Sequence, residues 1–447
     1  MKTPPTPSSA GLPARAGALS VLAAILDRGR PLDEAFEAET KTGPLARAEP
    51  RDRGFARAII ATTLRRLGQI DALLDDFLAQ PLPARAGTTR HILRAVAAEL
   101  LFLHVSPHAA VDSAVRLAAA DRNARHFKAL VNAVARRLAR DGAKLVAAQD
   151  AAQDAARLNT PAWLWQSWCK TYGEPTARAI AQAHLTEPPL DLSVKQNPEG
   201  WATRLGGEMI GATTVRLKPG GPPVDSLDGF ADGAWWVQDA AAALPARLFG
   251  NVTGRDVLDL CAAPGGKTAE LATAGARVTA LDRAAPRLQR LAENLARLQL
   301  DATLVRADAT AWQPARLWPL ILLDAPCSAT GTIRRHPDVA HLKTPKDRDK
   351  LAALQARLLD RAAGWLEPGG TLVYATCSLE PEEGPAQIDA FLARHPSFAR
   401  KPIKPNELDG LAGCISPEGD LRTLPCHLAD KGGMDGFFAA RLIRQNP

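Results

Sequence analysis

Two of the six cysteines occupy positions at which a thiol could act chemically. Cys327 lies in the segment Asp-Ala-Pro-Cys-Ser and Cys377 in the segment Ala-Thr-Cys-Ser, and each segment follows a short apolar run typical of a buried strand. A single cysteine in such a place is more often a small hydrophobic core residue. Two of them at strand ends, projecting over one sheet edge, instead predict a reactive site with a thiolate nucleophile.

The segment VLDLCAAPGGKT, residues 257–268, is the strongest candidate for a ligand-binding loop. An apolar run ends in small residues and two glycines, and a helical pattern follows. Ligands of parallel sheets bind at the carboxyl ends of strands, where glycines let them approach the backbone. The loop does not match GxGxxG, and Cys261 stands where the phosphate loop GxxxxGK[ST] needs its first glycine. Taken alone, the loop would fit a structural turn equally well.

Carboxylates end the neighbouring apolar runs. Asp282 and Asp324 close two of these runs, and Asp308 follows a third. A carboxylate at such a position can accept hydrogen bonds from both hydroxyls of a ribose, and another could receive an adenine amino group. One acid at a strand end is commonly a helix cap, but three beside a glycine loop favour a nucleoside cofactor. Because the dinucleotide glycines and an arginine for a 2′-phosphate are missing, S-adenosylmethionine fits better than NAD.

A methyl donor beside paired thiols predicts methyl transfer to a pyrimidine. Carbon 5 of cytosine is a poor nucleophile, but attack of a thiolate at carbon 6 makes it nucleophilic. A carboxylic acid such as Asp324 could stabilise or donate a proton at N3. A second thiol or a base must then assist loss of the C5 proton and elimination of the enzyme. The residues alone leave open which cysteine attacks.

Alternating strands and helices must position these groups. Apolar runs at residues 257–260, 278–281, 303–305, 320–323 and 371–374 predict buried parallel strands, and helical patterns lie at residues 267–273, 285–298 and 346–365. This alternation predicts an α/β Rossmann-like sheet. Residues 151–223 combine helical stretches with short apolar runs broken by Pro and Gly, which predicts a small α+β module. Residues 14–140 are helical almost throughout, which predicts an all-α domain.

Length and charge predict several domains, with the net positive charge confined to the first one. At about 100–200 residues per domain, 447 residues predict two or three domains. Hydrophobic residues (46%) and charged residues (23%) exclude a disordered chain. Residues 1–150 contain 22 Lys and Arg against 15 Asp and Glu, which accounts for the whole net charge of +7. This excess predicts a polyanion-facing domain, or a solvated basic surface, with Arg125, Lys128 and Arg136 along one helical edge.

The cysteines and the hydropathy pattern indicate the compartment. The six cysteines are scattered without CxxC spacing, which argues against disulfides and a zinc site. No apolar run approaches the roughly 18–20 residues that a membrane helix needs. We therefore expect a cytoplasmic protein without metal or membrane contact.

Together these motifs resemble a known family. The segments CAAPGGKT, DAPCS and YATCS resemble those of RNA cytosine-C5 methyltransferases. The segments DRGFAR (residues 52–57) and SPHAAV (residues 106–111) resemble a NusB-type RNA-binding domain. A NusB-like domain before such a methyltransferase is the arrangement of the RsmB (Sun/Fmu) family, which the chain resembles over nearly its whole length. The segments GTIRRHPD (residues 331–338) and DGFFAA (residues 435–440) match it as well.

The resemblance implies domains and roles. It implies a NusB-like domain at residues 12–142, a small α+β module at 150–228 and a class I methyltransferase domain at 229–447. Cys377 would be the nucleophile, and Cys327 would assist product release. The cofactor residues would be Cys261, Ala262, Ala263, Pro264, Gly265, Gly266, Lys267, Asp282, Asp308 and Asp324.

The implied substrate is 16S rRNA, at the cytosine conventionally numbered 967. Arg334 and Arg335 would meet a phosphate or the flank of a flipped base, unless they form a solvated charge pair. The chain departs from the family pattern around Ala340-His341-Leu342 and at Gly384, where Asn is common.

Two alternatives stay open. The substrate could be tRNA instead of rRNA. The chain could also be a non-catalytic NusB-like RNA-binding or antitermination factor, although intact Cys327, Cys377 and the complete glycine loop count against that. We expect a monomer that binds RNA.

Overall fold

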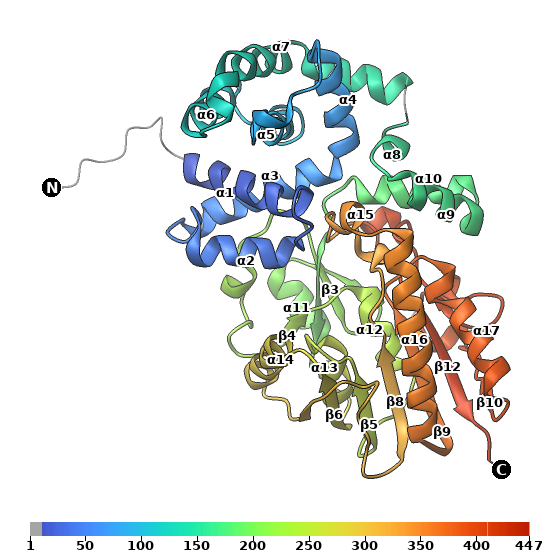
Figure 1. Ribbon diagram of the computed structural model, residues 1–447. Helices are drawn as coiled ribbons and strands as arrows, with labels where there is room; N and C mark the ends of the chain where they lie inside the picture. The colour runs from blue at the N-terminus through green and yellow to red at the C-terminus, as the bar shows by residue number, and fades with distance from the viewer. Residues whose placement is uncertain (1–10, 153, 409, 447) are drawn as a thin grey trace. The chain divides into compact units, whose positions relative to one another are not determined.

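The computed structural model describes residues 11–152, 154–408 and 410–446 and contains two compact units (Figure 1). The first unit comprises residues 1–169 together with 336–342, and the second comprises residues 170–335 and 343–447. The division into three domains at 12–142, 150–228 and 229–447 stays a prediction.

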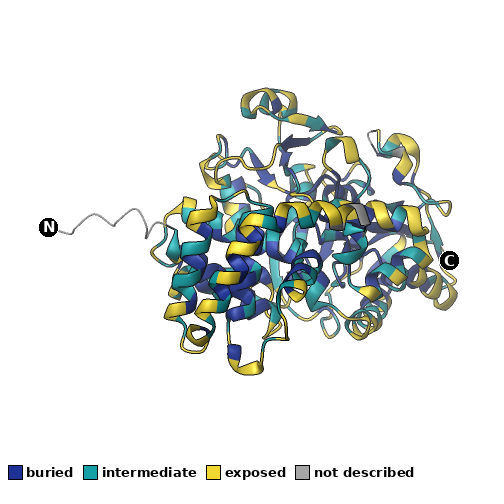
Figure 2. Ribbon diagram, turned by 90° about the horizontal axis from the view of Figure 1, so that it is seen from above, coloured by how far each residue is buried: buried dark blue, intermediate teal, exposed yellow. Residues whose placement is uncertain are grey.

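The first unit is all-helical, as the sequence predicts. Buried stripes recur every three or four residues along its helices, for example Val131, Val134 and Leu138 on α7. Figure 2 shows buried residues in dark blue on the faces that the helices turn toward one another. The helices are α1 (Leu12–Leu26), α2 (Leu32–Thr42), α3 (Pro50–Arg65), α4 (Leu67–Phe77), α5 (Thr89–Leu101), α6 (Pro107–Ala120), α7 (Lys128–Ala152), α8 (Ala155–Leu158), α9 (Ala162–Tyr172) and α15 (Val339–Leu342).

The short segment 336–342 belongs to the helical unit although it lies far along the chain. The backbone N–H of Leu32 donates a hydrogen bond of 2.9 Å to Asp338 Oδ2, and His341 Nε2 lies 2.9 Å from the carbonyl oxygen of Leu64. Burial lowers the pKa of His341. The departure from the family pattern around Ala340-His341-Leu342 therefore lies in a segment that is packed into the helical unit.

In the described part of the second unit, the main sheet has eight strands. Its order is β10-β12-β9-β8-β5-β6-β7, and β11 pairs with β12. Strands β5 to β9 run parallel to one another, whereas β12 is antiparallel to β9 and β10. The strands are β5 (Asp256–Leu260), β6 (Arg277–Asp282), β7 (Thr303–Arg306), β8 (Trp318–Asp324), β9 (Leu366–Thr376), β10 (Phe398–Arg400), β11 (Leu421–Arg422) and β12 (Phe438–Arg444).

Helices cover both faces of this sheet (Figure 1). Along β8, Ile321 and Leu323 pack with α16 (Pro345–Trp365) and α17 (Pro385–Arg394), whereas Leu320 and Leu322 pack with α12 (Ala240–Arg247) and α13 (Gly266–Thr273). Successive side chains of a strand point to opposite faces, so a strand buried on both sides is apolar throughout. The helix α14 (Ala285–Leu298) buries Leu291 and Leu295 against the loop that follows β5. The predicted α/β sheet is confirmed.

A separate four-stranded antiparallel sheet, in the order β2-β3-β1-β4, precedes the main sheet in the chain. It packs with a short helix around a small core that includes Leu192, Val215 and Trp235. Its strands are β1 (Leu190–Val194), β2 (Glu208–Ile210), β3 (Thr214–Leu217) and β4 (Trp235–Val237), and its helix is α11 (Pro198–Leu205). The helix α10 (Glu174–His184) precedes them in the chain. Across the described residues, no helix is long and apolar enough to cross a membrane.

Candidate active site

The two reactive cysteines meet at the carboxyl edge of the main sheet. Strands β8 and β9 are parallel neighbours with Asp324 opposite Ala375, so the segments that follow them leave the sheet side by side. The Sγ atoms of Cys327 and Cys377 lie 3.4 Å apart, within hydrogen-bonding distance for two sulfurs. The structure therefore brings together two thiols that are fifty residues apart in the sequence.

The protonation of Cys327 differs from that of an ordinary thiol. Its hydrogen bond with Cys377 and its burial raise the pKa of Cys327 well above the usual value, and the negative charge of Glu383 adds to the effect. Cys327 therefore carries its proton at neutral pH. A protonated thiol is a proton donor, whereas a nucleophile must be a thiolate. The contact between the two sulfurs lets one thiol attack while the other transfers a proton, and the assignment of the attack to Cys377 stays a prediction.

A buried lysine lies close to both Asp324 and Cys377. Lys267, in the first turn of α13, places its Nζ 2.7 Å from Asp324 Oδ2 and 5.0 Å from the ring centre of Phe437. Burial opposes the charge of Lys267, but the nearby Asp324 outweighs it and, with a contribution from Cys377, raises the pKa of Lys267. Lys267 is therefore a protonated group near Cys377. The sequence places this lysine in the glycine loop and does not show that it lies near a reactive thiol.

The loop between β5 and α13 is held by carboxylates. Cys261 and Gly265 both have positive φ angles, 62° and 105°, so the chain turns sharply between the strand and the helix. The backbone N–H of Ala263 donates to Asp282 Oδ2 over 3.2 Å. Burial raises the pKa of Cys261 to about 12, so this cysteine is a packed thiol. These contacts shape a loop whose backbone a ligand can approach closely.

The side chains at this edge fit S-adenosylmethionine. Asp282 and Asp324 end β6 and β8, and Asp308 lies two residues after β7, so three carboxylates meet the same edge of neighbouring parallel strands. Asp308 is exposed, and its hydrogen bonds from Thr310 lower its pKa. Carboxylates are suitable acceptors for ribose hydroxyls and for amino groups. We therefore retain the predicted assignment of Asp282, Asp308 and the loop 261–267 to the cofactor.

A further acid, Asp259, lies beneath the loop and was not among the predicted site residues. It is fully buried on β5, and Thr268 Oγ1 donates a hydrogen bond of 2.6 Å to its Oδ2. Among the residues that the structure describes, none forms a hydrogen bond with its Oδ1. Burial raises the pKa of Asp259 to about 7. The sequence does not show how deeply an acid within an apolar strand is buried, and for this reason Asp259 was not predicted.

Arg334 and Arg335 require a correction. Arg334 is 1% exposed, with its Nη2 2.5 Å from Asp239 and its Nε 2.7 Å from Asp435. Arg335 is also held by Asp239, at 2.6 Å, with 19% of its side chain exposed. Arg334 is therefore not placed to meet RNA, nor is the pair a solvated one. The sequence shows two adjacent charges, but it hides acidic partners that lie about a hundred residues away.

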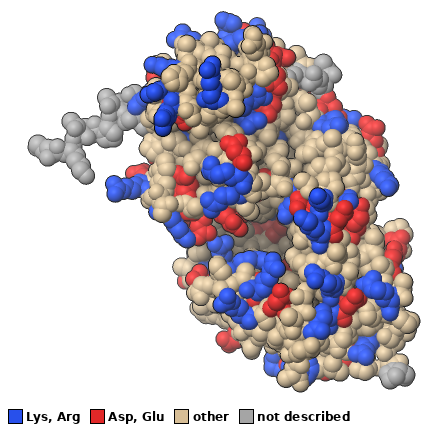
Figure 3. Space-filling view, in the orientation of Figure 1, with Lys and Arg blue, Asp and Glu red and all other residues tan. Residues whose placement is uncertain are grey.

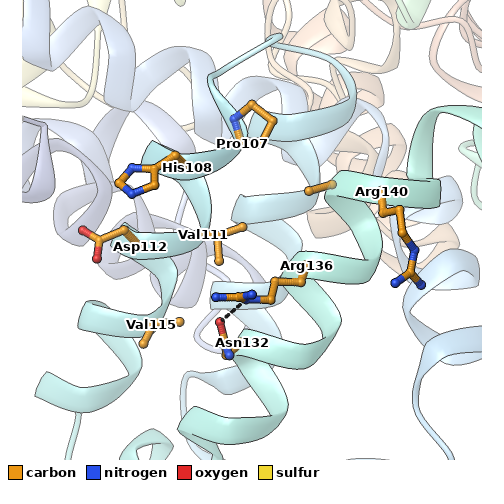
Figure 4. A pocket seen from close by; sticks show the side chains of 9 residues that line it. Pro107, His108, Val111, Asp112, Val115, Asn132, Arg136 and Arg140 are labelled. Carbon is orange, nitrogen blue, oxygen red and sulfur yellow. Dashed lines mark hydrogen bonds between the residues drawn. The ribbon is translucent and has the colours of Figure 1, made fainter.

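The three basic residues predicted to contact RNA in the helical unit are exposed, as expected. Arg125, Lys128 and Arg136 all lie on the surface, and Lys and Arg side chains line the upper rim of Figure 3. Arg136, with Arg140, borders a groove of about 510 Å³ between α6 and α7, whose floor includes Val111. Figure 4 shows Arg136 beside Asn132, to which its Nε donates a hydrogen bond of 3.1 Å. This surface offers cations for a polyanion.

A Rossmann-like sheet with a glycine loop, strand-end carboxylates and paired thiols defines a methyltransferase of the class that uses S-adenosylmethionine. Comparisons with known proteins agree. The model of the family described as 16S rRNA methyltransferase RsmB/F matches residues 248–443, and that of the NusB family matches residues 12–140.

Similar proteins extend this agreement over the whole chain. A ribosomal RNA small subunit methyltransferase B from Pseudomonas putida is 37% identical over 96% of this chain and 98% of its own length. The crystal structure of PH0851 covers 99% of this chain and all of its own, with 23% identity and a TM-score of 0.75. A methyltransferase homologue from Pyrococcus horikoshii, 28% identical, covers 65% of this chain and 97% of its own with a TM-score of 0.55.

The chain belongs to the ribosomal RNA small subunit methyltransferase B family. It is an S-adenosylmethionine-dependent enzyme, which confirms the resemblance and the cofactor drawn from its motifs.

Proposed function

We propose that the enzyme methylates carbon 5 of a cytosine in 16S rRNA through a covalent adduct between Cys377 and carbon 6. The observation that carries this proposal is the 3.4 Å contact between a proton-bearing Cys327 and Cys377, with protonated Lys267 beside them. Such a pair separates the two tasks of the reaction, because one thiol must attack the ring and another group must handle a proton.

The first task belongs to Cys377. Its thiolate attacks carbon 6, the sulfur–carbon bond forms, and the ring electrons move toward N3 and carbon 5. Lys267, paired with the Asp324 carboxylate over 2.7 Å, is the proton source, and its proton can pass to N3 through Asp324. When bound, S-adenosylmethionine supplies an electrophilic methyl group for carbon 5.

The second task is release. The C5 proton must leave and the bond between Cys377 and carbon 6 must break, which restores the aromatic ring and returns the electron pair to the sulfur. Cys327 lies in hydrogen-bond contact with that sulfur and gives its proton to it, and the Cys327 thiolate so formed accepts the C5 proton. The two thiols therefore alternate in holding one proton. The N3 proton returns to Lys267 through Asp324.

The helical unit would supply RNA affinity. Its surface carries Arg125, Lys128 and Arg136, which can neutralise phosphates. Because the reaction needs access to both faces of the base, the target cytosine must be unstacked or single-stranded. The proposal includes a monomer that acts in the cytoplasm.

Bisulfite mapping tests the proposal. Ribosomal and transfer RNA from cells lacking the protein is compared with RNA from cells rescued by the wild type or by Cys377→Ala. We expect one 16S rRNA cytosine, at position 967, to lose its methyl group and to regain it with the wild type alone. A tRNA position that follows this pattern would overturn the rRNA assignment. Rescue by Cys377→Ala would overturn the nucleophile.

A further inference from the structure

A fully buried carboxylate, that of Glu383, joins the two segments that carry the reactive thiols. Glu383 ends the 3-10 helix η6 (Pro381–Glu383), six residues after Cys377, and has no exposed surface. The reaction steps above do not use it. Its contacts fall into two sets, one on each cysteine segment.

The side chain of Glu383 holds the segment of Cys327. Its Oε1 accepts a hydrogen bond of 2.9 Å from the backbone N–H of Ser328, and its Oε2 accepts one from the hydroxyl of the same serine. Gln355 Nε2 donates to Glu383 Oε1 over 3.1 Å and to the carbonyl oxygen of Pro326 over 2.9 Å. Both neighbours of Cys327 are therefore tied to one carboxylate and one amide.

The backbone of Glu383 holds the segment of Cys377. Its carbonyl oxygen accepts hydrogen bonds from Tyr374 Oη (2.9 Å) and from Thr376 Oγ1 (3.1 Å), the residue before Cys377. The serines that follow the two cysteines also meet, because the hydroxyls of Ser328 and Ser378 lie 3.1 Å apart. One residue thus connects the neighbours of both thiols.

The position of Glu383 is costly for stability alone. A carboxylate without solvent loses its hydration, and here its hydrogen bonds come from uncharged donors, Ser328 and Gln355. A buried carboxylate whose oxygens accept several hydrogen bonds commonly fixes the positions of the segments that donate them. Its charge also contributes to the raised pKa of Cys327, behind the hydrogen bond with Cys377 and burial.

We propose that Glu383 is a positioning residue that sets the separation of the two thiols, holding Cys327 in contact with Cys377. The roles of the two thiols rest on the proposed function, but their separation does not. Loss of the Glu383 carboxylate would free the segment 326–328 and lengthen the contact between the sulfurs.

A dithiol reagent measures this separation directly. Phenylarsine oxide condenses with two neighbouring thiols, forming two arsenic–sulfur bonds and releasing water without any change of oxidation state. The full-length wild type should bind the reagent in a manner that depends on both cysteines, with Cys377→Ser supplying the background from the remaining thiols. Glu383→Gln should weaken that binding about tenfold, because it removes charge-assisted hydrogen bonds from the segment of Cys327.

The neighbouring acid provides a matched control. Glu382 is half-exposed and pairs with Arg348 over 2.9 Å, so Glu382→Gln should bind the reagent like the wild type. Ser328→Ala removes one hydroxyl donor and keeps the backbone contact. It should weaken binding in the same direction and by less, which provides a second test if Glu383→Gln folds poorly.

A second measurement separates positioning from general stability. In Glu383→Gln the methyl transfer rate should fall about tenfold while the affinity for S-adenosylmethionine stays unchanged. In a Cys377→Ser background, the pH profile of Cys327 alkylation should shift to lower pH when Glu383→Gln is added, because a negative charge has been removed.

Two outcomes would overturn the inference. Glu383→Gln could bind phenylarsine oxide as tightly as the wild type, or it could lose the binding only in proportion to a loss of cofactor affinity. Failure of the proposed function looks different. It would leave Cys377→Ala active in methyl transfer while the dithiol binding still depended on Glu383.

Discussion

Lys267 Nζ lies 2.7 Å from Asp324 Oδ2, so the helix that opens after the glycine loop is joined by an ion pair to the end of strand β8. The lysine side chain is 9% exposed and that of the aspartate 31%. Because Cys327 follows Asp324 by three residues, this pair links the cofactor loop to the thiol site. Cys377 also lies close enough to the ammonium group to contribute to the raised pKa of Lys267.

The variant Lys267→Met keeps the length of the side chain and removes the charge. We expect its single-turnover methyl transfer rate to fall by about 100-fold, because the proton held at N3 loses its source. Lys431→Met, at an exposed lysine, provides the control. A methyl transfer rate close to that of the wild type would show that Lys267 takes no part in the reaction.

Cys327→Ala should trap the enzyme on its substrate. The nucleophile can still attack, but the departing sulfur lacks its proton-sharing neighbour, so the covalent protein–RNA adduct accumulates. Denaturing gel electrophoresis detects it as a shifted band. Absence of that band with a methylatable RNA would show that Cys327 has no part in release. The double variant with Cys377→Ala should give no adduct.

Asp259 should impose a pH dependence on stability. Its pKa is raised by burial to about 7 in the folded protein, above the ordinary value of 3.8. Between these two values the folded state binds more protons than the unfolded state, so this group's contribution is fully present below pH 4 and is lost as the pH rises toward 7. Asp259→Asn resembles the protonated form. Relative to the wild type it should gain about 3 kcal/mol in free energy of unfolding between pH 5 and pH 8.

Urea unfolding at the two pH values measures this gain. Equal pH dependence in the wild type and in Asp259→Asn would contradict the prediction. The comparison is Asp75→Asn, at an exposed acid that pairs with Arg90 over 2.7 Å, which should gain less than about 1 kcal/mol.

Asp239 should contribute strongly to the stability of the second unit. It is buried, and although burial alone would raise its pKa, Arg335 and Arg334 outweigh that effect and lower the pKa well below the ordinary value. Its stabilising contribution is present above the ordinary aspartate pKa and is lost only as the pH falls below it. Asp239→Asn leaves buried guanidinium groups without their charge partner and should lower the free energy of unfolding by about 3 kcal/mol at pH 7.

Urea unfolding of Asp239→Asn at pH 7 checks this value. Asp360 forms a half-exposed ion pair with Arg394, so Asp360→Asn should cost less than about 1 kcal/mol. Similar effects of the two substitutions would mean that the Asp239 cluster is not a structural anchor.

RNA binding by the full-length protein should weaken as salt rises, because Lys and Arg side chains release counterions from phosphates. Lys128→Ala should reduce the slope of the logarithm of affinity against the logarithm of salt by about one. Lys41→Ala, at an exposed lysine that pairs with Glu37 in α2, is the control. A flat salt dependence in the wild type would contradict an RNA-binding role for the basic helices.

Much of the fold could be predicted from local patterns. The apolar runs of β5, β6, β7 and β8 and the amphipathic stripe of α14 are contiguous in the chain, so their periodicity predicts them. The antiparallel strand β12, Phe438–Arg444, was not predicted. Its ladder depends on residues about 65 positions earlier in β9, a pairing that no local pattern reports.

The candidate site divides in the same way. The types and the strand-end positions of Cys327, Cys377, Asp282 and Asp324 were readable from the sequence, because each follows an apolar run directly. The residues that contact these side chains could not be predicted from the sequence. Glu383 and the buried acids around Arg334 act through contacts between distant segments, and Asp259 depends on its depth in the sheet.

The sequence by itself therefore determined the fold class, the cofactor loop, the two thiols and the family, because these depend on residue type and local spacing. Only the tertiary structure decided how the charges are used. It placed Arg334 in the interior instead of at an RNA surface, and it paired Lys267 with Asp324. It also brought a buried carboxylate into contact with both cysteine segments. The physical reason is that desolvation and charge pairing depend on which distant groups surround a side chain, and that information arises only when the chain has folded.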